Sequence, residues 1–328
     1  MAEQKKTKQN SVHIVGYLKE NNLEQVSIQD KGEVIRGSLI IAVDETSNYK
    51  VQFYVPAVTK NGEDSKDFEL LSEILPEKTE SIAHYLKSNP GSTYETASQN
   101  ATKIWALARF EEFASIVGER SRSMVTLKGF KAGIKQETEE SPFNPHAEFT
   151  VDIFVNKITV EKEYADEDDE IGTDTGRLII EGLIPVFDES VYSIDFIAPA
   201  EGGIAEFVGN TYKQGDTATL KGELVNIDKK ILREDNNEEE FFGVPAGPQY
   251  KTIFIRERVI RGLSKKPIHQ GETDCITLAA VKTGLAKRLT KAQENGKRAA
   301  NGTNNAPSKT TSAPKAETKK DFAEDMDF

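Results

Sequence analysis

Two stretches of the chain share one pattern of hydrophobic and polar positions. Residues 34–57 (VIRGSLIIAVDETSNYKVQFYVPA) and residues 178–200 (LIIEGLIPVFDESVYSIDFIAPA) each contain an apolar β-rich run, a short polar turn, and a run that alternates with period two. Alternation with period two predicts strands, and two such runs around a short turn predict a β-hairpin. Because the pattern occurs twice, the sequence predicts a tandem of one all-β module.

Further strands complete each module. Residues 11–19 predict a first strand, and both copies contain Thr-Leu-Lys-Gly, at residues 126–129 and 219–222, which predicts a strand after a variable region. In the first copy this region is longer and helical in pattern. A capping box at Ser92 precedes apolar residues at helical spacing, which are Ala101, Ile104, Trp105 and Ala108.

About five strands with an insertion between the third and the fourth is the strand order of an OB-fold barrel. A generic β-sandwich or barrel is the alternative. The sequence thus predicts a mainly β protein with two tandem OB-fold-like five-stranded barrels. Its parts are a disordered N-terminus (1–10), module one (11–155) with a helical insert at about 65–117, module two (156–262), a C-terminal helix (263–294), and a disordered tail made of a flexible linker and an acidic tip (295–328).

Charge is distributed unevenly behind the net value of −12. Residues 251–320 contain sixteen Lys or Arg against five Asp or Glu, whereas residues 321–328 contain four acidic residues and no basic one. A long basic stretch followed by an acidic end is typical of chains that interact with polyanions or with protein partners.

The tail carries a resemblance to a known family. Residues 295–320 are rich in Gly, Asn, Thr, Ser, Pro, Ala and Lys, and the chain ends DFAEDMDF. This arrangement resembles bacterial and phage single-stranded DNA-binding proteins, although the proline that usually precedes the last residue is missing. Two modules in one chain fit a phage form with two modules better than the common tetrameric form.

The resemblance implies a protein that coats single-stranded DNA during replication, recombination or repair. It further implies that the tip recruits replication or recombination proteins through Asp321, Phe322, Glu324, Asp325, Asp327 and Phe328.

Contact with DNA requires outward aromatic and basic residues on the hairpin. Alternation places Tyr49, Val51 and Phe53 in the core and points Lys50, Gln52 and Tyr54 outward. An exposed edge aromatic without a ligand is an equally good interpretation of Tyr54. The expected nucleic-acid-binding residues are Arg36, Lys50, Gln52, Tyr54, Lys128, Lys221, Lys251, Arg256, Arg258 and Arg261.

The second module differs at the matching positions. Its outward set is Ser193, Asp195 and Ile197, with Glu181 nearby. An acidic face repels phosphates, so module one is expected to bind DNA more strongly than module two.

Other chemistries have little support in the sequence. The single Cys275 and four scattered histidines predict no metal site, and no glycine-rich phosphate loop occurs, so we expect neither an enzyme nor a cofactor. Without a long apolar run or a secretory signal, we expect no membrane association and a cytoplasmic location, in the host cytoplasm if the gene is phage-encoded. The alternative function is a β-rich virion or assembly protein whose acidic tail is incidental.

Overall fold

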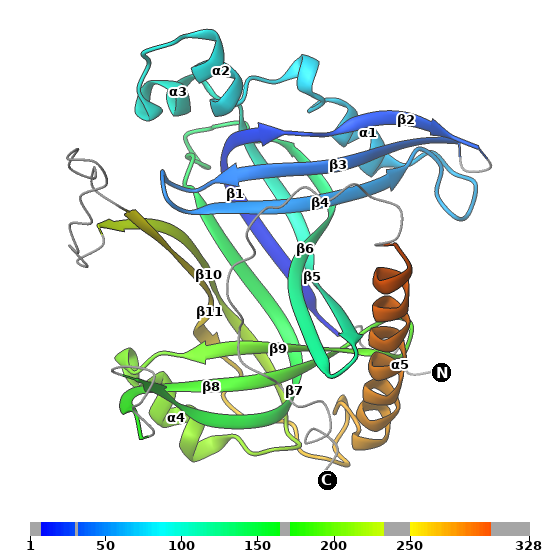
Figure 1. Ribbon diagram of the computed structural model, residues 1–328, viewed down its shortest axis with the longest axis vertical. Helices are drawn as coiled ribbons and strands as arrows, with labels where there is room; N and C mark the ends of the chain where they lie inside the picture. Colours follow the sequence, from blue (N-terminus) through cyan, green and yellow to red (C-terminus); the bar gives the residue numbers. More distant parts are fainter. Residues whose placement is uncertain (1–7, 30–31, 165–170, 233–249, 303–328) are drawn as a thin grey trace, which may run out of the picture.

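The computed structural model describes residues 8–29, 32–164, 171–232 and 250–302 (Figure 1). Within these ranges eleven strands form one large sheet, which confirms the prediction of a mainly β protein. The strands are β1 (Asn10–Asn21), β2 (Glu24–Ile28), β3 (Gly32–Ala42), β4 (Asn48–Pro56), β5 (Lys103–Val117), β6 (Arg120–Ile134), β7 (His146–Glu163), β8 (Thr173–Pro185), β9 (Val191–Ala198), β10 (Thr217–Leu232) and β11 (Tyr250–Leu263). The helices are α1 (Lys66–Ser72), η1 (Pro76–Lys78), α2 (Ile82–Ser88), α3 (Tyr94–Asn100), η2 (Glu201–Gly203), α4 (Ile204–Thr211) and α5 (Leu278–Gly302).

The sheet closes on itself twice. In ring one, β1 pairs with β3 and β5, β3 pairs with β4, and β6 pairs with β5 and, in parallel, with β4. Ring two repeats these pairings. There β7 pairs with β8 and β10, β8 pairs with β9, and β11 pairs with β10 and, in parallel, with β9. An antiparallel pairing of β1 with β7 joins the rings.

The chain passes from ring one to ring two between β6 and β7, and β7 spans the predicted module boundary at residues 155 and 156. Val151 falls within the predicted module one, but it pairs with Asn10 of β1 on one side and with Leu220 of β10 in ring two on the other. Ring one closes with β6. The two Thr-Leu-Lys-Gly segments therefore occupy different positions, because one lies in the fifth strand of its ring (β6) and the other in the fourth (β10).

The helical insert is shorter than predicted. Three short helices are present, capped by Ser65, Ser81 and Thr93 rather than Ser92, and the last ends at Asn100. Residues 103–117, predicted as helix, form strand β5. Ile104, Ala106, Ala108 and Phe110 are buried with period two. The apolar residues of this segment are compatible with a helix and with a strand. Pairing with β1 and β6 stabilises the strand.

The rings share one hydrophobic core. Phe110 of ring one lies with its ring centroid 5.8 Å from that of Phe149 and 6.1 Å from that of Phe196, both in ring two. All three side chains are almost completely buried. Phe110 and Phe196, which lie 86 positions apart (196 − 110), thus belong to one aromatic cluster.

Helix α5 crosses β5 and β9 (Figure 1). It begins after Thr277, whose hydroxyl accepts a hydrogen bond from the Ala280 backbone N–H, and not at the predicted residue 263. The helix continues through residues 295–302, which were predicted as linker. Its buried positions are Val281, Gly284, Leu285, Arg288, Ala292 and Gly296. No helix in the described part of the chain is long and apolar enough to span a membrane.

Candidate nucleic-acid interface

The outer face of ring one carries the predicted hairpin residues. Along β4 the side chains of Tyr49, Val51 and Phe53 are buried, whereas Lys50, Gln52 and Tyr54 are exposed. The predicted alternation of this strand is therefore confirmed. Tyr54 exposes 43% of its surface, a large fraction for an aromatic side chain.

Strand register brings basic residues from four strands onto this face. Arg36 of β3 lies opposite Tyr54, Gln52 lies opposite Lys128 of β6, and Lys128 lies opposite Arg109 of β5. Neighbours across a sheet have Cβ atoms about 5 Å apart, so these side chains form one continuous surface. Arg109 is not in the predicted set of nucleic-acid-binding residues, and the structure adds it to this face.

Two of these four cationic side chains form ion pairs with carboxylates. The Arg36 Nε atom lies 2.6 Å from Glu24, and the Lys128 Nζ atom lies 3.3 Å from Glu111. Within the described residues neither Lys50 nor Arg109 forms an ion pair. Exposed pairs of this kind contribute little to stability, so phosphates can replace their carboxylates at small cost.

Three further exposed apolar residues extend the face. Phe113 and Met124 lie opposite each other on β5 and β6 and expose 50% and 57% of their surface, and Phe130 exposes 42%. Sequence reasoning missed them. A period-two interpretation of residues 103–117 would have pointed Arg109, Glu111 and Phe113 to the same side.

The matching face of ring two is not an exposed acidic surface, and that prediction is wrong. Glu181, Ser193 and Ile197 are all buried, and Asp195 is half-buried. The cause is contact with ring one, because the Ser193 backbone N–H donates to Glu112 of β5 at 2.9 Å. The Ser193 hydroxyl in turn donates to Glu181 at 2.6 Å.

The basic residues predicted in ring two are dispersed. Lys221 is exposed on β10, and the backbone of Lys251 pairs with Ile231 on β11. Arg258 donates to the Asp195 carbonyl at 3.2 Å. Arg261 is paired with Glu223, and this hydrogen bond raises the pKa of the guanidinium.

Arg256 lies on the β10–β11 hairpin, which contacts ring one. It is paired with Asp228 and lies 5.4 Å from the ring centroid of Phe254, which is 59% exposed. Its hairpin, β10–β11, meets the start of β4, where the Tyr49 hydroxyl donates to the Leu224 carbonyl at 2.6 Å.

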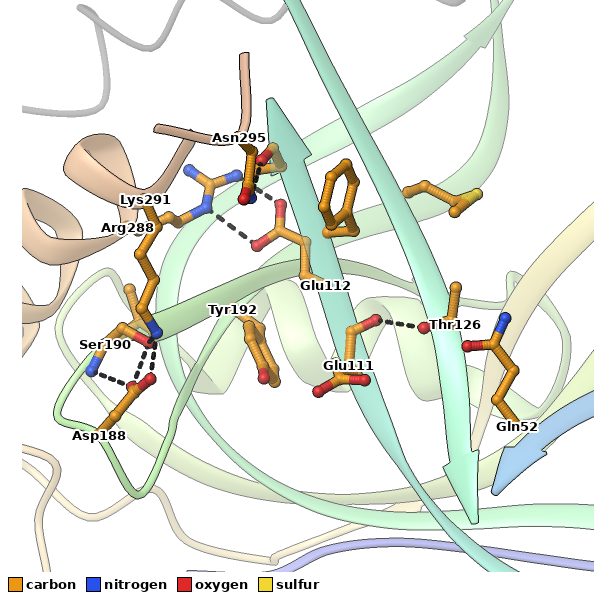
Figure 2. Close-up of a pocket in the computed structure, with 14 residues that line it drawn as sticks. Gln52, Glu111, Glu112, Thr126, Asp188, Ser190, Tyr192, Arg288, Lys291 and Asn295 are labelled. Atoms are coloured by element: carbon orange, nitrogen blue, oxygen red, sulfur yellow. Dashed lines mark hydrogen bonds and ion pairs between the residues drawn. The ribbon is translucent and has the colours of Figure 1, made fainter. Parts of the chain in front are cut away.

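A groove of about 440 Å³ separates the outer face of ring one from α5 and the β8–β9 turn (Figure 2). Ring one contributes Gln52, Glu111, Glu112, Phe113, Ala114, Met124 and Thr126, and the opposite wall consists of Asp188, Ser190, Val191, Tyr192, Arg288, Lys291 and Asn295.

A buried ion pair closes one side of this groove. Arg288 of α5 donates to both carboxylate oxygens of Glu112, at 2.7 and 2.9 Å, and the two side chains are 7% and 1% exposed (Figure 2). Glu112 also accepts from Ser123 and from the Ser193 backbone N–H. One carboxylate therefore binds both rings and α5 together.

Two other side chains in the groove have shifted pKa values. A hydrogen bond from Lys291 lowers the pKa of Asp188 to about 2, so this carboxylate stays ionised. Burial, together with the nearby Glu111, raises the pKa of Tyr192 to about 12, so its hydroxyl stays protonated. No cluster of three or more potential metal ligands occurs among the described residues.

Comparison with known proteins places the chain in one family. The family model described as YorF matches residues 8–88 and 100–282. No curated protein matches the chain. Among solved structures, the wild-type single-stranded DNA binding protein from Thermus aquaticus has 13% identity and a TM-score of 0.43, over 81% of this chain and 96% of that one. A deletion mutant of that protein has 13% identity and a TM-score of 0.41, over 81% and 97%.

Proposed function

The chain belongs to the YorF family, and we propose that it binds single-stranded DNA on the outer face of ring one. The observation that carries the proposal is the set of neighbours around Tyr54, an exposed aromatic with Arg36, Lys50, Arg109 and Lys128 on the same four-stranded surface. Proteins that bind single strands combine aromatic side chains, on which bases stack, with cations that neutralise the backbone.

We further propose that each ring is an OB-fold-like barrel. The order of pairing supports this, because in both rings the first strand pairs with the second and fourth, and the fifth joins the third in parallel. OB-folds bind oligonucleotides on the face of their second and third strands, which in ring one are β3 and β4. The proposed role is to coat single strands in replication, recombination or repair without catalysing a reaction.

Salt titration tests the function directly. If the four cations on ring one each neutralise a phosphate, log affinity is expected to fall linearly with log salt with a slope of about −3, at roughly −0.7 per contact. Fluorescence anisotropy with a labelled oligo-dT measures the slope. Duplex DNA of equal length should bind much more weakly, and equal affinities would contradict single-strand binding.

Replacing Tyr54 tests the stacking site. Tyr54→Ala is expected to weaken binding of oligo-dT by about 1–3 kcal/mol, the usual contribution of one base–aromatic stack. The matched control is Phe207→Ala, which removes a 38% exposed aromatic from α4, away from the proposed face. If the two variants lose the same affinity, Tyr54 has no special contact with DNA.

The acidic tip, whose residues Asp321–Phe328 lie outside the described part of the chain, is proposed to recruit partner proteins. A segment with four carboxylates also competes with DNA for the same cations. Its deletion is expected to tighten single-strand binding at low salt, with the gain fading as salt screens the attraction. An unchanged affinity at low salt would leave the tip without this competing role.

A further inference from the structure

The groove between ring one and α5 is continuous with the proposed DNA-binding face. Gln52 belongs to both, since it lies between Lys50 and Tyr54 on β4 and also lines the groove (Figure 2). From Gln52 the groove continues along β6 and β5 to the facing pair of Met124 and Phe113. A strand bound at Tyr54 therefore has an aromatic and a thioether within the adjoining hollow.

The charges of the groove suit a neutral ring better than a phosphate. Its two cations are already engaged, Arg288 with the buried Glu112 and Lys291 with Asp188. The remaining acid, Glu111, is paired with Lys128. A phosphate placed here would meet three carboxylates without an uncommitted cation, whereas Lys50 and Arg109 lie on the neighbouring outer face.

The polar groups around Glu111 in the groove are mainly hydrogen-bond acceptors. The Glu111 carboxylate offers about four lone-pair sites, of which the Lys128 ion pair at 3.3 Å uses a part. The Thr126 hydroxyl donates to the Glu111 backbone carbonyl, so its proton is committed. Carboxylates accept from the amino group of cytosine, whereas the matching atom of thymine is a carbonyl oxygen, which they repel.

We propose that this groove holds an unstacked base of the bound strand, with the base against Phe113 and its amino group toward Glu111. The inference rests on the proposed function and adds a second stacking site and a base preference. Cytosine is favoured over thymine. The bound DNA strand would then also contact ring two, at the β8–β9 turn, and α5, because both line the groove.

Binding of labelled dC and dT oligonucleotides of equal length tests the proposal. Both are pyrimidines, so their self-stacking differs less than that of a purine and a pyrimidine oligonucleotide. The intact protein is expected to bind oligo-dC roughly 5–10-fold more tightly than oligo-dT, within the range for one base-specific contact. Glu111→Gln should bring the ratio of the two affinities near one. This variant also frees Lys128 to bind phosphate, but that gain is equal for both oligonucleotides and leaves the ratio unchanged.

Phe113→Ala is expected to weaken binding of oligo-dC by roughly tenfold or more, and Phe113→Tyr should retain it. The control is Val117→Ala, which alters a 47% exposed apolar residue of the same strand outside the groove. Equal affinity of the intact protein for the two oligonucleotides would overturn the inference. So would a Phe113→Ala variant that binds like the control while Tyr54→Ala still weakens binding. If the intact protein binds neither oligonucleotide, the proposed function itself fails.

Discussion

Arg288→Ala is expected to destabilise the folded protein by about 3–5 kcal/mol, because it leaves the Glu112 carboxylate buried without its charged partner. The Glu112 side chain is only 1% exposed, so Arg288 supplies most of the charge compensation that water would supply at the surface. Chemical denaturation followed by circular dichroism measures the change in the free energy of unfolding. Glu112→Gln should also destabilise, since an uncharged amide replaces one partner of the bidentate ion pair.

The matched control for this prediction is an exposed ion pair. Lys78 and Glu73 lie 3.2 Å apart with side chains 44% and 68% exposed, and Lys78→Ala is expected to cost less than about 1 kcal/mol. A loss of similar size in Arg288→Ala would mean that the buried pair does not hold α5 against the two rings.

Phe110→Ala is expected to cost about 3–5 kcal/mol and to lower the stability of both rings together. Phe110 is 1% exposed and touches Phe149 and Phe196 across the junction, so its removal opens a cavity that both rings line. Calorimetry should show one transition, shifted to lower temperature.

The neighbouring Phe113→Ala provides the comparison, because this residue is on the same strand but 50% exposed. The free energy of unfolding is expected to change by less than about 1 kcal/mol in Phe113→Ala, because substitutions at exposed positions have small effects on stability. Two separate transitions, of which only one moves in Phe110→Ala, would show that the rings unfold independently and that the shared core does not couple them.

The sequence predicts those parts of the fold that depend on local pattern. In β4, alternation of polar and apolar residues correctly separates Tyr49, Val51 and Phe53 from Lys50, Gln52 and Tyr54. This separation can be predicted from the residues of β4 alone, because one side of the strand faces the core of ring one and the other faces solvent.

The same reasoning fails in β9 because its outer side is covered by distant residues. Glu112 is 81 positions from Ser193, yet their hydrogen bond and the packing of α5 remove the expected exposed surface. Similarly, residues 103–117 fit a helix as well as a strand until pairing with β1 and β6 is known. The groove joins segments from both rings and α5, so no local pattern predicts it.

Strand β7 has a practical consequence for anyone who wishes to divide the protein. It supplies an edge partner to β1 of ring one and is itself the first strand of ring two, so strand pairing joins the two halves although residues 135–145 form a loop between them. A fragment that stops before His146 leaves one edge of β1 unpaired and uncovers Phe110, and one that begins there deprives Phe149 and Phe196 of their aromatic neighbour. For cloning and truncation, residues 8–302 are therefore best kept as one indivisible unit.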